Sequence, residues 1–233
     1  MNKDFKAYGA EFVGTFTLCL IGQGAICAQA LTGSGSLLAV AVAHGLALAV
    51  MISALGAVSG GHLNPAVTFG FFVTGRQSAQ STIAYWASQI LGAVVASFAV
   101  RSLFPDSVWQ SVHLGAAELH PSLTSVGGVL TEFIMTFFLV TAVWGTAVDE
   151  RHPPIGGFGI GLAVCMGILM GGPLTGGAMN PARAFGPALV ANYWPAHWVY
   201  WVGPLLGGAA AALFYDRWIL GRSGPMKLSA PSA

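Results

Sequence analysis

A short motif that could bind a polar molecule occurs twice in an otherwise apolar chain. It reads Asn64-Pro65-Ala66 in the first half and Asn180-Pro181-Ala182 in the second, each after a glycine-rich run. Asparagine is favoured as the cap of a helix N-terminus, and proline is favoured directly after it. Each motif therefore predicts a helix start with unpaired N–H groups and a partial positive charge. If the asparagine oxygens cap these helices, the amide N–H donors point into the space between them.

Three ionisable residues lie close to these motifs or inside apolar segments. Arg183 follows Asn180 by three residues and adds positive charge to a positive helix end, an arrangement that excludes cations. A salt bridge from Arg183 to Glu11 or Glu132 is the alternative. Glu11 and Glu132 each open a Glu-Phe pair, which favours the same structural role in both places: accepting hydrogen bonds from the loop before a motif. A proton relay through the two glutamates is the alternative.

The composition predicts an integral membrane protein. Hydrophobic residues make up 55% of the 233 residues and charged residues 7%, whereas soluble domains carry about 25% charge. The net charge of +1 comes without a basic or acidic block, so nothing indicates a nucleic acid partner. A bilayer requires about 20 apolar residues per helix. We expect six membrane-spanning helices, at residues 8–28, 37–57, 83–103, 126–148, 155–172 and 198–218.

The apolar runs that follow the two motifs, residues 64–74 and 180–190, are too short to cross a bilayer. We expect each to be a re-entrant half-helix, which must face protein or a cavity because lipid offers no hydrogen bonds. Half-helices that merely plug a helix bundle are the alternative to half-helices that line a passage.

The chain contains an internal repeat. Glu11-Phe12 and Glu132-Phe133 are 121 residues apart, and the two motifs are 116 residues apart. Three spans per half is an odd number, so the second half must be inverted in the membrane. We expect an all-α membrane protein with six transmembrane helices and two re-entrant half-helices that meet near the middle. One channel domain covers residues 1–233, with halves at about 1–115 and 116–222 and a disordered tail at 223–233.

Lysine and arginine gather on the side of the two chain termini, which predicts that both termini are cytoplasmic and that the protein lies in the cell membrane. The three cysteines, Cys19, Cys27 and Cys165, lie in apolar stretches without metal-ligand spacing. We expect them to be small buried packing residues, and we expect no metal or cofactor.

The paired motifs, the arginine after the second, the paired glutamates and the repeat together resemble the aquaporins, the major intrinsic protein family, over residues 8–218. The resemblance implies a homotetramer in which each subunit has its own pore. It also implies a selectivity filter at four positions counted from the motifs: His44, Ile168, Gly177 and Arg183. Strict water channels of the family tend to have phenylalanine and histidine at the first two positions.

These filter residues resemble those of tonoplast intrinsic proteins and of animal aquaporins that pass ammonia and hydrogen peroxide. Glycerol facilitators commonly have aspartate after the motif arginine, where this chain has Ala184, and they lack the Tyr200-Trp201 pair. His62 is expected to brace the loop before the first motif, and His120 is a candidate to reach the filter from an outer loop.

The sequence therefore predicts a passive channel for water and small neutral solutes such as ammonia and hydrogen peroxide, which excludes protons and ions. The alternative is a secondary transporter, since inverted repeats and broken helices also build those proteins. A transporter needs intramembrane ionisable residues to couple an ion, and beside histidine only Glu11, Glu132 and Arg183 qualify. An enzyme is not expected, because the sequence offers no nucleophile–base pair and no metal cluster.

Overall fold

The computed structural model describes residues 3–151 and 155–222. In the first half the helices are α1 (Lys3–Thr32), α2 (Leu37–Ser59), α3 (Pro65–Val73) and α4 (Ala79–Leu103). In the second half they are α6 (Ser125–Val143), α7 (Phe158–Thr175), α8 (Pro181–Ala191) and α9 (Val199–Phe214). The connection between the halves contains the short helix α5 (Asp106–Ser111) and the 3-10 turn η1 (His113–Gly115). The tail expected to be disordered, residues 223–233, lies outside the described residues.

The expected spans are present, with shifts at their ends. Within the described residues, five helices are long and apolar enough to cross a membrane: α1, α2, α4, α6 with the π-helical turn η2 (Trp144–Val148), and α7. The sixth expected span is α9, whose 16 residues continue directly into the 5-residue π-helical turn η3 (Tyr215–Ile219). The α-helical part alone is short because the helix widens to a π-turn at Tyr215. α7 begins at Phe158 and ends at Thr175, three residues later at each end than expected.

The two runs after the motifs form the half-helices α3 and α8, and each packs mainly on the last span of the other half. α3 lies against α9, and α8 lies against α4. Within each half the contacts repeat: α1 packs on α2 and α4, and α6 packs on α7 and α9. Between the halves, α2 also packs on α7. Neither half can therefore cover its own half-helix without the other.

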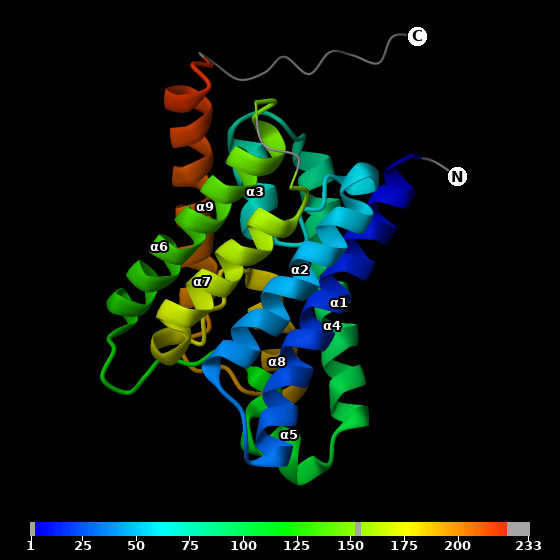
Figure 1. Cartoon of the computed structure of the whole chain (residues 1–233), viewed down its shortest axis with the longest axis vertical. Helices are drawn as coiled ribbons and strands as arrows, with labels where there is room; N and C mark the ends of the chain where they lie inside the picture. Colours follow the sequence, from blue (N-terminus) through cyan, green and yellow to red (C-terminus); the bar gives the residue numbers. More distant parts are fainter. Residues whose placement is uncertain (1–2, 152–154, 223–233) are drawn as a thin grey trace.

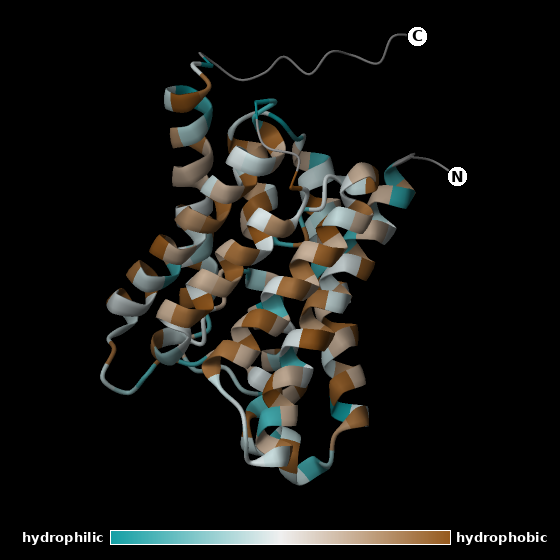
Figure 2. Cartoon of the chain, viewed as in Figure 1, coloured by the Kyte–Doolittle hydropathy of each residue, from teal (hydrophilic) through white to brown (hydrophobic). Residues whose placement is uncertain are grey.

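The first residues of α1 and the end of η3 lie at the same end of the bundle, which we call the terminal face (Figure 1). The loop between α1 and α2 and the short helix α5 lie at the other end, which we call the opposite face (Figure 1). Hydrophobic residues follow the lengths of the helices, and hydrophilic residues gather mostly at the two faces (Figure 2). This distribution matches helices that lie in a bilayer.

Glycines allow the helices to cross closely at equivalent places in the two halves. A Cβ on Gly92 would lie 2.5 Å from the Phe12 carbonyl oxygen, and one on Gly207 would lie 2.3 Å from the Phe133 carbonyl oxygen. α2 and α7 cross in the same way between the halves, with a Cβ on Gly161 placed 2.3 Å from the Gly45 carbonyl oxygen. Small residues at such contacts bring helix backbones together in lipid.

Two of the three cysteines are packing residues as expected, because Cys19 and Cys27 are buried. Cys165 is only partly buried and lines a groove between α2 and α7. The expectation that all three are buried is therefore wrong for Cys165, because Gly45 and Gly161 leave the outer surface of this crossing open.

The close crossing of α2 and α7 predicts that a single methyl group added at Gly161 destabilises the protein. Gly161→Ala should lower the free energy of unfolding by about 1–3 kcal/mol, because the two helices must move apart. The loss is measured as a lower midpoint of thermal unfolding in detergent. Gly24→Ala in α1 is the matched control, since a Cβ there meets nothing within 4 Å. Equal midpoints for the two variants would contradict the prediction.

Candidate functional site

Two asparagines cap the two half-helices from equivalent positions. Asn64 Oδ1 accepts a hydrogen bond of 2.8 Å from the Ala66 N–H. Asn180 Oδ1 accepts hydrogen bonds from the Ala182 N–H at 3.0 Å and the Arg183 N–H at 3.2 Å. Since the amide oxygen of each side chain is held on its own helix tip, the amide nitrogen faces away from that tip.

Each amide nitrogen is bonded to the loop of the other half. Asn64 Nδ2 donates to the Met179 carbonyl oxygen at 2.8 Å, and Asn180 Nδ2 donates to the Leu63 carbonyl oxygen at 2.9 Å. The sequence led us to expect both hydrogens of each amide in the space between the helices, and the structure shows that one of them is used in this bond. Because an amide group has two N–H donors, one per asparagine remains for a molecule between the helices.

The two residues that accept these bonds have an unusual backbone. Leu63 has a φ of 49° and Met179 a φ of 51°, which places both in the left-handed region that non-glycine residues rarely adopt. This conformation directs each carbonyl group to the asparagine of the other half and each N–H group to a buried glutamate. The strained loops are thus held by hydrogen bonds on both sides.

Glu11 holds the loop before the first motif. Its Oε1 accepts from the Ser59 hydroxyl at 2.7 Å and the His62 N–H at 2.9 Å. Its Oε2 accepts from the Leu63 N–H at 2.6 Å and from Gln89 Nε2 at 2.7 Å. The carboxylate is completely buried, so these four donors replace water around its charge.

Glu132 holds the loop before the second motif in the same way. Its Oε1 accepts from the Thr175 hydroxyl at 2.7 Å and the Ala178 N–H at 2.9 Å, and its Oε2 accepts from the Met179 N–H at 2.7 Å. Thr175 and Ser59 are 116 residues apart, as the two motifs are. The geometry of both glutamates is that of a loop brace.

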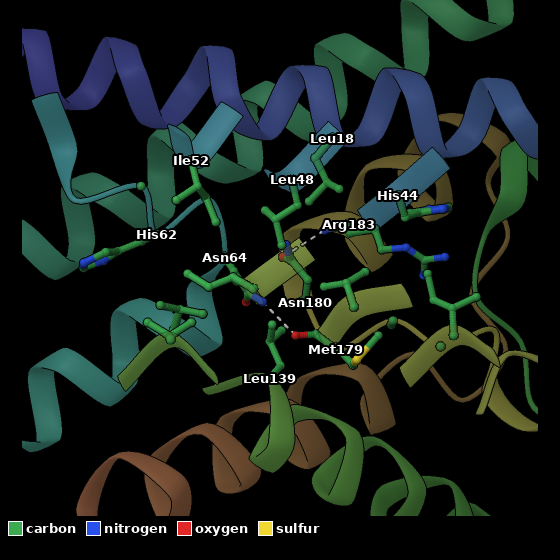
Figure 3. A pocket seen from close by; sticks show the side chains of 18 residues that line it. Leu18, His44, Leu48, Ile52, His62, Asn64, Leu139, Met179, Asn180 and Arg183 are labelled. Atoms are coloured by element: carbon green, nitrogen blue, oxygen red, sulfur yellow. Dashed lines mark hydrogen bonds between the residues drawn. The ribbon is translucent and has the colours of Figure 1, made fainter. Parts of the chain in front are cut away.

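A single cavity runs past both asparagines (Figure 3). Figure 3 shows Asn64 and Asn180 near its middle, with His44 and Arg183 towards one end and Ile52 and His62 towards the other. Apolar side chains cover most of the remaining wall: Leu18, Leu48, Val67, Leu139, Val143, Ile160 and Val164. All four residues expected to form a filter line this cavity.

Arg183 presents unpaired donors to the cavity. Its Nη2 donates to the Gly176 carbonyl oxygen at 3.1 Å, and Nε and Nη1 have no hydrogen-bond partner. Arg183 is only 6% exposed. The salt bridge considered from the sequence is absent: neither Glu11 nor Glu132 forms an ion pair with this guanidinium. The charge therefore remains available to act on whatever enters.

The other three residues expected to form a filter bring different chemical groups to the cavity. His44 Nδ1 lies 2.8 Å from the Val40 carbonyl oxygen, and its ring packs over Gly22, where a Cβ would lie 2.2 Å from Nε2. Gly177 has a φ of 59°, and a Cβ there would lie 3.2 Å from the Cα and Cγ1 of Ile168. A polar ring, an aliphatic chain and a bare backbone thus surround the cavity beside Arg183.

The two loop histidines differ in whether they reach the cavity. His62 lines the cavity, and its ring is fixed because Nδ1 lies 3.1 Å from the Thr68 hydroxyl and the ring stacks on Phe71. His120 is exposed and does not line the cavity; its Nδ1 lies 2.8 Å from the Ser122 hydroxyl. His120, the candidate for a contribution from an outer loop, lies outside this cavity, because its backbone is tied to the Leu174 carbonyl and its ring to its own turn.

Two polar residues of the site were not identified from the sequence. Gln89 donates from Nε2 to both Glu11 and Thr68, at 2.7 and 2.9 Å. Tyr85 donates from its hydroxyl to the Ser59 carbonyl oxygen at 2.7 Å. Both lie on α4, far in sequence from the first motif, and only their polar side chains within an apolar span could have drawn attention to them.

Comparisons with known proteins agree with this geometry. A family model described as major intrinsic protein matches residues 1–215. The chain is 46% identical to probable aquaporin TIP3-2 of Arabidopsis thaliana, over 92% of this chain and 84% of that protein. It is 44% identical to aquaporin TIP4-4 of Zea mays, over 94% and 88%. The solved structure of the aquaglyceroporin from Plasmodium falciparum aligns with a TM-score of 0.83 at 26% identity, covering 94% of this chain and 98% of that one.

The brace around Glu132 predicts a large effect of a small change. Glu132→Gln should lower the free energy of unfolding by about 3 kcal/mol, because one acceptor oxygen becomes an NH2 group that faces buried donors. The midpoint of thermal unfolding in detergent measures the loss. Glu150→Gln makes the same exchange at an exposed position and should leave the midpoint unchanged. If Glu132→Gln unfolds at the wild-type temperature, the carboxylate does not brace the loop.

Proposed function

The chain belongs to the major intrinsic protein family, and from this premise we propose that its cavity is the pore of a passive channel for water, ammonia and hydrogen peroxide that excludes protons and ions. Membership of this family makes the protein a multi-pass integral membrane channel for water and not an enzyme. The fold is the one expected from the sequence. The solute range, the pore residues and the assembly are what we propose.

One observation carries the proposal: two helix tips with one free amide N–H each meet inside a single cavity. Asn64 and Asn180 both line the cavity, and each has used one of its two amide hydrogens in the bond to the opposite loop. The remaining hydrogen can donate to a neutral oxygen or nitrogen atom. A cation meets two positive helix ends, which raises its energy at the same point.

The cavity wall supports the same conclusion. Arg183 adds two unpaired donor nitrogens and a positive charge at one end. Among the residues that the structure describes, no aspartate or glutamate lines the cavity. Small neutral molecules with lone pairs therefore find hydrogen-bond partners along the path, whereas cations find no compensating charge.

The filter residues support solutes beyond water. Ile168 replaces a hydrogen-bonding ring with an aliphatic chain, and Gly177 contributes no side chain at all. A wider and partly apolar constriction lowers the cost of passing ammonia or hydrogen peroxide in place of water. His44 keeps one polar group opposite, since its ring lines the cavity.

The secondary transporter considered from the sequence has less support. Of the residues considered for ion coupling, Glu11 and Glu132 have carboxylates that are completely buried, occupied by three or more donors and outside the cavity wall. Releasing a proton or binding an ion there would break the loop that forms the pore. Water flux that is independent of sodium and proton gradients is the expected result.

We propose a homotetramer in which each chain contains its own pore, with residues 1–115 and 116–222 forming one channel domain. The terminal face is assigned to the cytoplasm by the positive-inside rule, because Lys6, Arg76, Arg151 and Arg222 flank it, whereas Arg101 lies in the last turn of α4 towards the opposite face. The cell membrane remains our predicted location. Imaging of a tagged chain, with protease protection of the tag, tests both assignments.

The function is tested with purified protein in liposomes. Stopped-flow light scattering measures osmotic water flux, and a pH-sensitive dye inside the liposomes measures alkalinisation by ammonia. We expect both rates to rise in proportion to the amount of protein, without a change in proton leak. If the protein raises the water flux but not the rate of alkalinisation, it is a water channel that does not pass ammonia.

The filter predicts how the solute range can be narrowed. His44→Phe combined with Ile168→His should lower ammonia flux several-fold relative to water flux, because the constriction becomes narrower and more polar. Ile52→Val, at the far end of the same cavity, is the control and should keep the wild-type ratio. An unchanged ratio in the double variant would show that these residues do not set the solute range.

A further inference from the structure

A buried carboxylate lies at the terminal face, outside the cavity described above. Asp216 in η3 is 5% exposed, and its Oδ1 accepts hydrogen bonds from Arg76 Nε at 2.9 Å and Nη2 at 2.5 Å. Trp144 Nε1 makes a longer contact of 3.5 Å with the same oxygen. We propose that Asp216 is a positioning residue for water conduction. It fixes the C-terminal end of α3 and thereby the part of the pore nearest the terminal face.

Arg76 is rigidly attached to α3. Gly75 follows the helix with a φ of 70°, and its N–H donates to the Phe72 carbonyl oxygen at 2.9 Å. The Arg76 N–H donates to the Phe71 carbonyl oxygen at 2.8 Å. These two bonds form a Schellman motif, which fixes the backbone of Arg76 relative to the last turn of α3. The ion pair with Asp216 therefore ties the end of α3 to the end of α9.

Trp144 provides a second contact between Asp216 and α3. Its side chain is completely buried, and a Cβ on Gly70 of α3 would lie 3.3 Å from its ring atom Cη2. The Trp144 ring also lies 4.7 Å from the Phe71 ring, measured between centroids. Asp216 thus contacts Arg76 at the end of α3 and Trp144 on the flank of α3.

The contacts continue from Phe71 to the cavity wall. Phe71 stacks on His62 with a centroid distance of 4.2 Å and an interplanar angle of 25°. His62 lines the cavity, and its neighbour Leu63 accepts the cross-bond from Asn180. Val143, directly before Trp144, lines the cavity as well. A shift of α3 or Trp144 therefore moves atoms of the pore wall.

The second half does not repeat this anchor. The position 115 residues before Asp216 is Arg101, whose guanidinium lies 4.9 Å above the Trp109 ring. The end of α8 is held differently, because the Tyr193 hydroxyl donates to Glu118 and its ring stacks on His113. The anchor at Asp216 therefore holds the end of α3, and the end of α8 is held by other residues. We expect the loss of Asp216 to change water conduction without changing the selectivity set by Arg183 and His44.

The experiment measures water flux per reconstituted protein and the ratio of ammonia to water flux. Asp216→Asn should lower water flux several-fold, because Arg76 is left unpaired and the end of α3 is released. The ratio of the two fluxes should stay near the wild-type value. Arg151→Ala is the control: among the described residues, this exposed arginine forms its ion pair with Asp149, two residues away, and the variant should conduct water like the wild type.

A second variant guards against misfolding. Asp216→Ala with Arg76→Ala removes both charges, so no buried charge is left unpaired, but it also removes the tie between α3 and α9. We expect monodisperse protein with reduced water flux. Wild-type water flux in this double variant, or in Asp216→Asn, overturns the proposal. A reduced flux with a changed ammonia ratio also overturns it, because the effect then reaches the filter.

This proposal rests on the proposed function, water conduction through the cavity. The channel function and the positioning role of Asp216 can be disproved separately. Wild-type protein that conducts no water contradicts the channel itself. Conducting wild-type protein with equally conducting Asp216 variants contradicts only the positioning role.

Discussion

Backbone N–H groups in a loop inside a membrane protein need acceptors, and this constraint shapes the centre of the molecule. The loops before α3 and α8 turn through left-handed residues and cannot use helical hydrogen bonds. Glu11 and Glu132 supply carboxylate oxygens for these groups from α1 and α6. The same turns direct two carbonyl groups to the asparagines of the opposite half. The centre of the cavity is therefore one network of hydrogen bonds in which backbone strain and charge burial are linked.

The two halves share this centre and differ towards the faces. Glu11 has a fourth donor, Gln89, whereas the position 115 residues later is Pro204, which has no side-chain donor. The end of α3 is tied by the Arg76–Asp216 ion pair, and the end of α8 by a tyrosine and an exposed glutamate. Duplication accounts for the matched helix tips, and divergence accounts for two faces that can serve different tasks. The filter that we propose lies on one side of this division, and the anchor that we propose lies on the other.

Local sequence was enough to predict the spans, the half-helices and their caps. Asparagine before proline specifies a helix start, and the length of each apolar run separates a span from a half-helix. Contacts between distant segments were not accessible in this way. The cross-bonds from the asparagine amides depend on left-handed Leu63 and Met179, and neither residue type favours that backbone. The sequence does not single out Asp216, because a charge at a helix end is usually solvated, and it leaves His120 only a candidate, because a hydrogen bond within its own turn cannot be read from residue type.

The proposed channel depends on a path that admits neutral molecules and rejects ions where the two helix tips meet. Ionic current and osmotic water flux measured on the same reconstituted protein test it most directly. We predict water flux that rises with the amount of protein, while the current stays at the level of protein-free membranes under both salt and proton gradients. A current that rises in step with the water flux would contradict the account.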